Sequence, residues 1–127
     1  MTVVDTSVLI NVERGNAQSM ALVAELLLDG ELAVSTITVH EVLRSRSLSA
    51  EWRAHWLAFF DAVFVLDLDG PAAEVAAGLW VEQSRLNRRP DVGDVLIAGA
   101  AAAAGLEAVT ADEGFAELTG ARLLRAS

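Results

Sequence analysis

Four carboxylates stand at chain positions from which a folded α/β domain could gather them in one place. They are Asp5, Glu41, Asp94 and Asp112, and each lies at the edge of an apolar segment. Converging carboxylates repel one another, so a fold that brings them together normally holds a divalent cation there. This pattern predicts a metal-dependent enzyme that acts on phosphate esters.

Alternating strand and helix patterns provide the frame that must position these carboxylates. Short apolar runs bounded by turn residues predict strands, at residues 2–4, 32–35, 63–66 and 107–110, with 122–124 as a final edge strand. Apolar residues at helical spacing predict helices, at residues 17–28, 36–48, 51–62, 72–86, 94–104 and 113–118, with a further helix beginning at Thr6-Ser7. This alternation indicates a parallel sheet covered by helices on both faces.

In open parallel sheets, functional sites lie beyond the C-terminal ends of the strands. Asp5 directly follows the first strand, and Asp112 comes two residues after the fourth. Asp94 lies at or near a helix start, and Glu41 lies about one turn into another helix. Structural roles are the alternatives: a plain N-cap for Asp94 and a turn aspartate for Asp112. If the four meet without a cation, their repulsion should raise carboxylate pKa values.

Composition limits the class of protein. At 127 residues without cysteine, the chain predicts a single domain, residues 1–127, with no disulfide. The N-terminus does not resemble a signal peptide, and no apolar run reaches the ~20 residues that span a bilayer. We therefore expect a cytoplasmic protein that does not bind membranes.

The charge balance bears on possible nucleic-acid partners. A net charge of −9 argues against them, because phosphate binding rests on basic residues. However, all nine basic residues are arginine, the better planar partner for phosphate. Arg44, Arg46, Arg88 and Arg89 are the candidates for holding flanking phosphates; solvated helix faces are the alternative.

The donor types favour one kind of ion. Carboxylate oxygens suit Mg²⁺ or Mn²⁺. Zinc would need His or Cys, and His40-Glu41 begins a zinc-protease pattern in which Arg44 stands where the second histidine should be. A receiver domain would need a lysine, which the chain lacks, and a dehalogenase-type site would need an aspartate at the position of Ser7.

Four segments together resemble the sequence motifs of PIN-domain nucleases. Residues 3–10 contain Asp5 in ValValAspThrSer, residues 35–44 contain Glu41, residues 92–106 contain Asp94, and residues 108–115 contain Asp112. The motifs come in the family's order and cover nearly the whole chain. The length of the chain resembles that of the VapC toxins of prokaryotic toxin–antitoxin pairs.

The resemblance implies a fold and an activity. The fold is a three-layer α/β/α PIN-like arrangement with a central, mostly parallel five-stranded sheet. The activity is a Mg²⁺- or Mn²⁺-dependent endoribonuclease that hydrolyses RNA phosphodiesters. The partners implied are the RNA substrate, a second copy in a homodimer and a VapB-like antitoxin.

The resemblance also assigns roles to residues. Asp5 and Asp94 would be direct metal ligands, while Glu41 and Asp112 would hold a second ion or act through water. Ser7 and Thr110 would support the site. The alternative is a PIN-like interaction module without catalysis, but the presence of all four acids argues against it. On residues 51–62, Trp52, Trp56 and Phe59 share one helical face, which favours burial in the core or a dimer interface.

Overall fold

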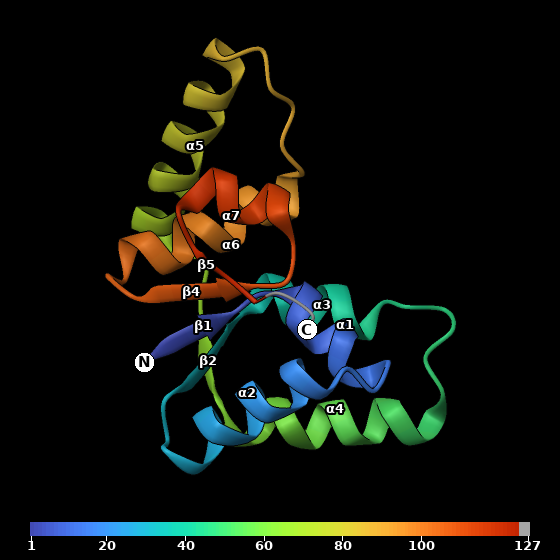
Figure 1. Cartoon of the computed structure of the whole chain (residues 1–127). Coiled ribbons are helices and arrows are strands. Elements are labelled where there is room, and N and C mark those ends of the chain that lie inside the picture. Colours follow the sequence, from blue (N-terminus) through green and yellow to red (C-terminus); the bar gives the residue numbers. More distant parts are fainter. Residues whose placement is uncertain (125–127) are drawn as a thin grey trace.

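The sheet that carries the candidate carboxylates is parallel throughout. The computed structural model describes residues 1–124, apart from the Thr119 side chain. The strand order is β3-β2-β1-β4-β5, and each neighbouring pair is parallel. The strands are β1 (Thr2–Val4), β2 (Leu32–Ser35), β3 (Phe64–Leu66), β4 (Glu107–Thr110) and β5 (Arg122–Leu123). This architecture, visible in Figure 1, confirms the predicted fold class.

Helices connect the strands, and side chains fix where each helix begins. At every N-terminus, the residue before the helix accepts a hydrogen bond from a backbone N–H of the first turn. The helices are α1 (Thr6–Glu13), α2 (Ala17–Leu28), α3 (Thr36–Leu43), α4 (Ala50–Ala62), α5 (Gly70–Arg85), α6 (Val92–Ala103) and α7 (Glu113–Thr119). The capping residues are Asp5, Asn16, Ser35, Ser49, Asp69, Asp91 and Asp112.

Several predicted boundaries differ from the structure, and two of these concern helices that carry candidate site residues. Helix α3 ends at Leu43 rather than at residue 48, and the Arg53 guanidinium donates a hydrogen bond to the Leu43 carbonyl at 2.8 Å. The serines that follow bond to each other instead of continuing the helix, with Ser45 and Ser47 hydroxyls 3.1 Å apart. Helix α6 begins at Val92, before Asp94, because Asp91 is the cap.

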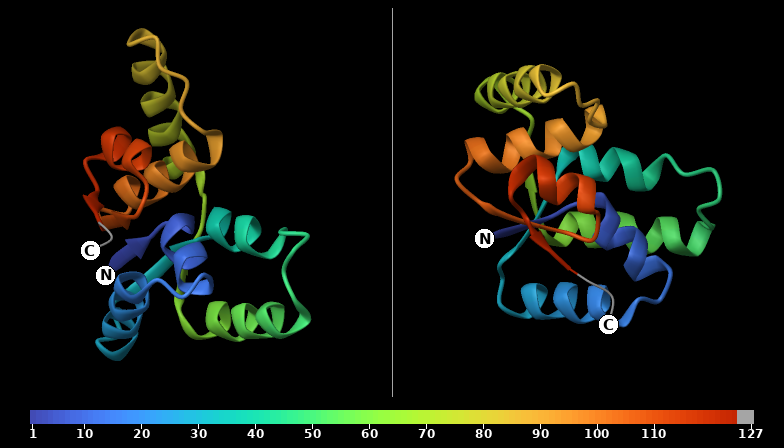
Figure 2. Two further views of the ribbon diagram at one scale, coloured as in Figure 1. Left: turned by 45° about the vertical axis from the view of Figure 1, so that its right-hand side comes forward. Right: turned by 45° about the horizontal axis from the view of Figure 1, so that its top comes forward.

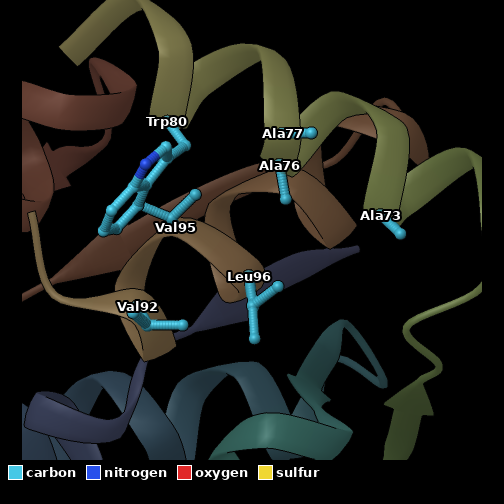
Figure 3. A pocket seen from close by; sticks show the side chains of 7 residues that line it. All are labelled: Ala73, Ala76, Ala77, Trp80, Val92, Val95 and Leu96. Carbon is cyan, nitrogen blue, oxygen red and sulfur yellow. The ribbon is translucent and has the colours of Figure 1, made fainter. Parts of the chain in front are cut away.

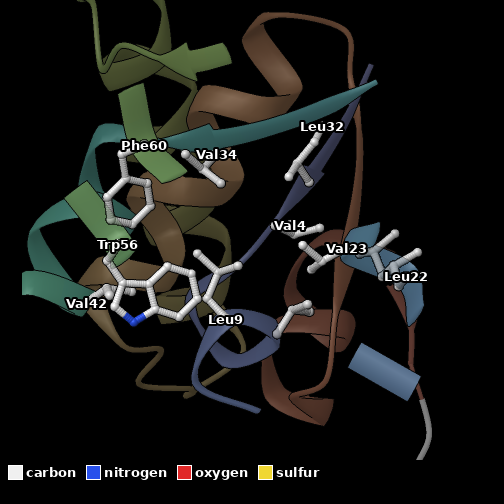
Figure 4. Close-up of a cluster of buried hydrophobic side chains, with 11 residues drawn as sticks. Val4, Leu9, Leu22, Val23, Leu32, Val34, Val42, Trp56 and Phe60 are labelled. Carbon is white, nitrogen blue, oxygen red and sulfur yellow. The ribbon is translucent and has the colours of Figure 1, made fainter. Parts of the chain in front are cut away.

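The alternation of side chains along the strands produces two cores, one on each face of the sheet. Val4, Val34 and Val109 face α1, α2, α3 and α4, where Trp56 and Phe60 of α4 complete the cluster drawn in Figure 4. Trp52 and Phe59 are partly buried against the same cluster, so the aromatic face of α4 packs on the core, as predicted. The described chain contains no helix long and apolar enough to cross a membrane.

The second core is built from smaller residues. Val3, Ala33 and Ala108 face α6 and α7, and alanines of α6 pack on this side. In the views of Figures 1 and 2, α5, α6 and α7 cover one side of the sheet, and α5 extends beyond it. The N-termini of α1, α3, α5 and α7 each follow the C-terminal end of a strand, so four chain reversals occur at one sheet edge.

Candidate active site

Asp5 is the most deeply buried of the four candidate carboxylates. It follows β1, is only 2% exposed and caps α1 through a bond from the Val8 backbone N–H. Ser7 Oγ donates to its Oδ1 at 2.6 Å, and Thr110 Oγ1 donates to its Oδ2 at 2.5 Å. Burial raises the pKa of Asp5, while these hydrogen bonds oppose the rise because they stabilise the ionised form.

Ser7 and Thr110 hold this aspartate and also tie the ends of two strands together. Ser7 Oγ accepts from the Ala111 backbone N–H at 3.0 Å, so α1 is joined to the chain beyond β4. Thr110 Oγ1 accepts from the Asp112 backbone N–H at 2.9 Å. The predicted supporting residues are therefore in contact with Asp5, and both its oxygens have a fixed donor.

Glu41 reaches the same sheet edge from α3. Its Oε1 accepts a hydrogen bond from Thr6 Oγ1 at 2.6 Å, and Thr6 lies at the start of α1. Its Oε2 lies 3.7 Å from the Arg44 guanidinium, one turn further along. The same oxygen packs against the start of α6, where a Cβ placed on Gly93 would lie 2.6 Å from it. Glu41 therefore connects α1 and α6.

Asp94 lies in the first turn of α6 and is half-buried. Because Asp91 caps the helix, the interpretation of Asp94 as a plain N-cap is wrong. Burial and then the charge of Asp91 raise the pKa of Asp94 to about 7, with further contributions from Asp112, Asp5 and Glu41. The expected rise is present, but burial is its largest cause and repulsion comes second. The charges of the three other candidates therefore all act on Asp94.

Asp112 is exposed and has a structural role as well. Its Oδ2 accepts from the Phe115 backbone N–H at 2.9 Å, which caps α7. Its charge nevertheless contributes to the raised pKa of both Asp5 and Asp94. The turn-aspartate alternative therefore describes part of what Asp112 does, at a position close enough to act on the other acids.

The donor atoms of the four carboxylates suit a hard divalent cation, but their side chains are not yet close enough together to enclose one. Carboxylate oxygens suit Mg²⁺ or Mn²⁺, and the charges of Asp5, Glu41 and Asp112 all contribute to the raised pKa of Asp94. Yet among residues 1–124, no three acidic or histidine side chains form a ready-made metal cage. Carboxylate rotamers adjust readily, whereas the backbone positions of the four acids do not, so a cation can draw the side chains together without a change of fold.

The four candidate arginines are divided between two loops. Arg44 pairs with Glu41 and so lies at the carboxylates, and Arg46 is exposed on the loop between α3 and α4. Arg88 and Arg89 lie on the loop between α5 and α6, where they line a separate pocket. Within residues 1–124, neither forms an ion pair with any of the four carboxylates.

Sequence reasoning missed three residues that shape the site. Thr6 holds Glu41, buried Thr38 lies 3.1 Å from the Thr6 hydroxyl, and Gly93 leaves room for the Glu41 carboxylate. Thr6 and Glu41 are 35 residues apart, so no local pattern indicates their bond. A glycine beside Asp94 in the first turn of a helix is a signal that could have been noticed, because glycine disfavours helices.

Comparison with known proteins identifies the family. The model of the PIN domain matches residues 2–121. The chain belongs to the PIN-domain family. The PIN motifs anticipated at Asp5, Glu41, Asp94 and Asp112 therefore lie within a segment that the family model covers.

One curated relative and two solved structures are similar to this chain. Ribonuclease VapC5 of Mycobacterium tuberculosis is 34% identical over 125 residues, which cover 94% of this chain and 88% of the relative. The crystal structure of VapBC-5 from M. tuberculosis, a member of the VapBC family of toxin–antitoxin systems, has a TM-score of 0.68 at 29% identity, over 98% of this chain and 97% of that one. DNA-bound VapBC from Salmonella typhimurium has a TM-score of 0.77 at 23% identity, over 99% and 98% of the two chains, and shows the shared fold.

Proposed function

We propose that this chain is an endoribonuclease of the VapC type, the toxin of a toxin–antitoxin pair. One observation carries the proposal: the charges of Asp5, Glu41 and Asp112, from three other segments, all act on Asp94 at the C-terminal edge of a parallel sheet. The relationship to Ribonuclease VapC5 supports RNA as the substrate. The alternative is an interaction module without catalysis, and such a module would not need acids whose charges repel one another around Asp94.

The roles of the carboxylates follow from their surroundings. Asp5 is held in place by Ser7 and Thr110, as a direct metal ligand would need to be. Asp94 gains and loses its proton near neutral pH, so a bound cation would keep it ionised as the second direct ligand. Glu41 and Asp112 would orient water or hold a second ion. Arg44 would restrain Glu41 and contact a flanking phosphate, with Arg46 beside it.

The cofactor of this reaction would be Mg²⁺ or Mn²⁺. When bound, such an ion activates water and neutralises charge on the scissile phosphodiester. Ser7 and Thr110 would keep Asp5 in place as the charge of the site changes. Thr6 would do the same for Glu41, because its hydroxyl donates to one oxygen and leaves the other available.

The proposed partners beyond RNA are an antitoxin and a second copy. A VapB-like protein would neutralise the toxin, as the toxin–antitoxin relationship of the VapBC-5 relative suggests. We also propose a homodimer, a single PIN domain over residues 1–127, and a cytoplasmic location. Light scattering of the purified chain tests the dimer, and co-purification with the product of the adjacent gene tests the antitoxin.

A cleavage assay tests the activity. Purified protein should cut RNA with Mn²⁺ or Mg²⁺ and stop cutting in EDTA. Asp94→Asn should abolish cleavage, whereas Asp61→Asn, which changes an exposed acid on α4, should cut at the wild-type rate. Cleavage at the wild-type rate by a folded Asp94→Asn protein, or in EDTA, would refute the proposed function.

A further inference from the structure

The loop between α5 and α6 forms a pocket separate from the carboxylates. This pocket, called the Trp80 pocket below, has a volume of about 570 Å³ and is lined by Trp80, Ser84, Asn87, Arg88 and Arg89. Its volume falls within the ~300–1,000 Å³ of small-ligand sites. The chain has eighteen acidic and nine basic residues, yet two arginines and no acid line this pocket. The pocket is a positive region on an acidic protein.

The two arginines of the Trp80 pocket are available for a ligand. Within residues 1–124, no hydrogen bond or ion pair engages the guanidinium of Arg88 or Arg89. Their neighbour Arg85 differs, because it lies 3.8 Å from Glu82. Arginine guanidinium groups bind phosphate through two parallel N–H donors. The pocket therefore presents two unengaged phosphate-binding groups.

Trp80 gives the pocket an aromatic wall. Its side chain is 41% exposed, and it also lines a second, apolar hollow of about 320 Å³ between α5 and α6. Figure 3 shows the indole reaching from α5 toward α6, where Val92 and Val95 lie near it. The ring lies beside these apolar side chains, and part of it is open to solvent. Such a ring is a surface on which a nucleic-acid base can stack.

The backbone holds the arginine loop in a fixed turn. Asn87 adopts the left-handed region with φ of 54°, which asparagine tolerates better than most residues. The Arg88 backbone N–H donates to the Gln83 carbonyl at 2.9 Å, so the chain folds back on the end of α5. This turn keeps Arg88 and Arg89 beside the last turn of the helix that carries Trp80.

The Trp80 pocket is close enough to the carboxylates for one RNA strand to reach both. Arg89 precedes Asp94 by five residues, and five residues span at most ~18 Å even when fully extended. Part of that segment is the first turn of α6, which shortens the distance. A nucleotide in the pocket would therefore be near the scissile bond along the strand.

We propose that the Trp80 pocket binds one unpaired nucleotide of the RNA, with the base stacked on Trp80 and the phosphate held by Arg88 and Arg89. Ser84 and Asn87 supply hydrogen-bonding groups for the sugar or the base edge. The proposal deepens the proposed function and rests on it, because the nucleotide flanks the bond that is cut. A base within a duplex is stacked on its neighbours, so the pocket selects single-stranded RNA.

Binding measurements test the pocket directly. The probes are a short, fluorescently labelled, unstructured RNA and the same RNA annealed to its complement, with anisotropy measured in an Asp94→Asn background. Stacking contributes about 1–3 kcal/mol per base, so Trp80→Ala should weaken binding of the single strand by roughly fivefold to a hundredfold. Trp80→Phe should retain most of the affinity. Phe64→Ala, which removes an exposed aromatic ring on β3, is the matched control and should bind as well as the parent.

Salt dependence separates the two kinds of contact. Each lost phosphate contact lowers the slope of log K against log salt concentration by about 0.7 for a single strand. Arg88→Ala and Arg89→Ala should each reduce this slope, whereas Trp80→Ala should weaken binding without changing it. Arg85→Ala, the control for charge alone, should reduce it less, because Arg85 is paired with Glu82.

Three results would overturn the pocket assignment. The first is unchanged single-strand affinity in Trp80→Ala, and the second is an equal loss for single strand and duplex. The third is an altered oligomeric state of Trp80→Ala by light scattering, which would make Trp80 a subunit contact.

Cleavage kinetics keep this test separate from the proposed function: in the active protein, Trp80→Ala should raise KM and leave kcat unchanged. If Asp94→Asn still cuts RNA, the proposed activity fails while the binding result stands.

Discussion

At the scale of single residues, the hydroxyl of Thr6 makes the shorter of the two polar contacts of the Glu41 carboxylate within residues 1–124. It donates at 2.6 Å to one oxygen of Glu41, whose carboxylate otherwise has only an arginine at 3.7 Å in the described chain. A hydrogen bond to a charged group contributes about 1.5–3 kcal/mol. We expect Thr6→Val to lower kcat/KM for RNA by roughly tenfold to a hundredfold if that energy is lost in the transition state.

Thr6→Ser is the matched variant, because it retains the hydroxyl and should recover most of the activity. Mn²⁺ affinity, measured by calorimetry, distinguishes positioning from a general loss of stability: it should fall in Thr6→Val and be near normal in Thr6→Ser. Equal affinity in both variants would show that Thr6 does not position Glu41.

Asp94 makes the stability of the metal-free protein depend on pH. Its pKa rises from an ordinary 3.8 to about 7 on folding, so between these values the folded state binds more protons than the unfolded state. Stability should therefore fall as the pH rises from about 4 to about 7, and this contribution should then level off. Asp5, whose pKa is also raised, adds a change in the same direction.

Thermal unfolding in EDTA at a series of pH values tests this expectation. Asp94→Asn should raise the melting temperature at neutral pH and make the pH dependence shallower, with the Asp5 contribution remaining. Asp61→Asn, a substitution at an exposed acid, should reproduce the wild-type curve. A wild-type stability that rises from pH 4 to 7 would contradict the assignment.

At the scale of elements, the contact between α5 and α6 depends on a glycine. A Cβ on Gly99 would lie 2.6 Å from the Ala76 Cβ and 2.8 Å from the Ala72 carbonyl oxygen. Because backbone cannot move aside as a flexible side chain does, Gly99→Ala should cost about 1–3 kcal/mol. It should also lower activity, since α6 carries Asp94.

Gly78→Ala on α5 is the matched control. A Cβ there meets nothing within 4 Å, and alanine is the better helix former. The substitution should stabilise the protein by about 0.5–1 kcal/mol. Urea unfolding measures the free energy of unfolding of both variants. If the Gly99→Ala protein were as stable as the Gly78→Ala protein, α5 and α6 could move apart at little cost in free energy.

The positions of strands and helices could be predicted from the sequence, whereas contacts between distant elements could not. Strand positions followed from apolar runs, and the parallel order from their alternation with helices, because both signals are local. The early end of α3 was missed, since it depends on Arg53 reaching the Leu43 carbonyl from another helix. The positions of Asp5 and Asp112 were predictable from strand ends, whereas the Thr6–Glu41 bond required knowing how α1 packs on α3.

At the scale of the whole molecule, a bound cation should stabilise the fold. An ion that binds only the folded state contributes about 2.7 kcal/mol at a concentration one hundred times its Kd. Each kcal/mol shifts the melting temperature of a domain this size by roughly 2–8 °C. Millimolar Mn²⁺ should therefore raise the melting temperature clearly, because it neutralises acids that burial and repulsion disfavour.

Differential scanning fluorimetry with Mn²⁺, Mg²⁺ and Ca²⁺ measures this effect. The Mn²⁺ shift should be much smaller in Asp94→Asn, which starts from a more stable metal-free state. Phe64→Ala, far from any candidate ligand in the sequence, should keep the full shift. The absence of any shift in the wild-type protein would count against a metal site built from these residues.

The half-buried position of Asp94 has an evolutionary consequence. Asparagine there would remove a disfavoured charge and leave the α6 cap intact, since Asp91 provides it. An aspartate codon becomes an asparagine codon through a single base change. Where a harmful activity ceases to be useful, mutants at Asp94 would persist as well-folded, inactive proteins. Asp5 offers no such route, because two hydroxyls donate to its carboxylate and an amide would face one of them with its own hydrogens.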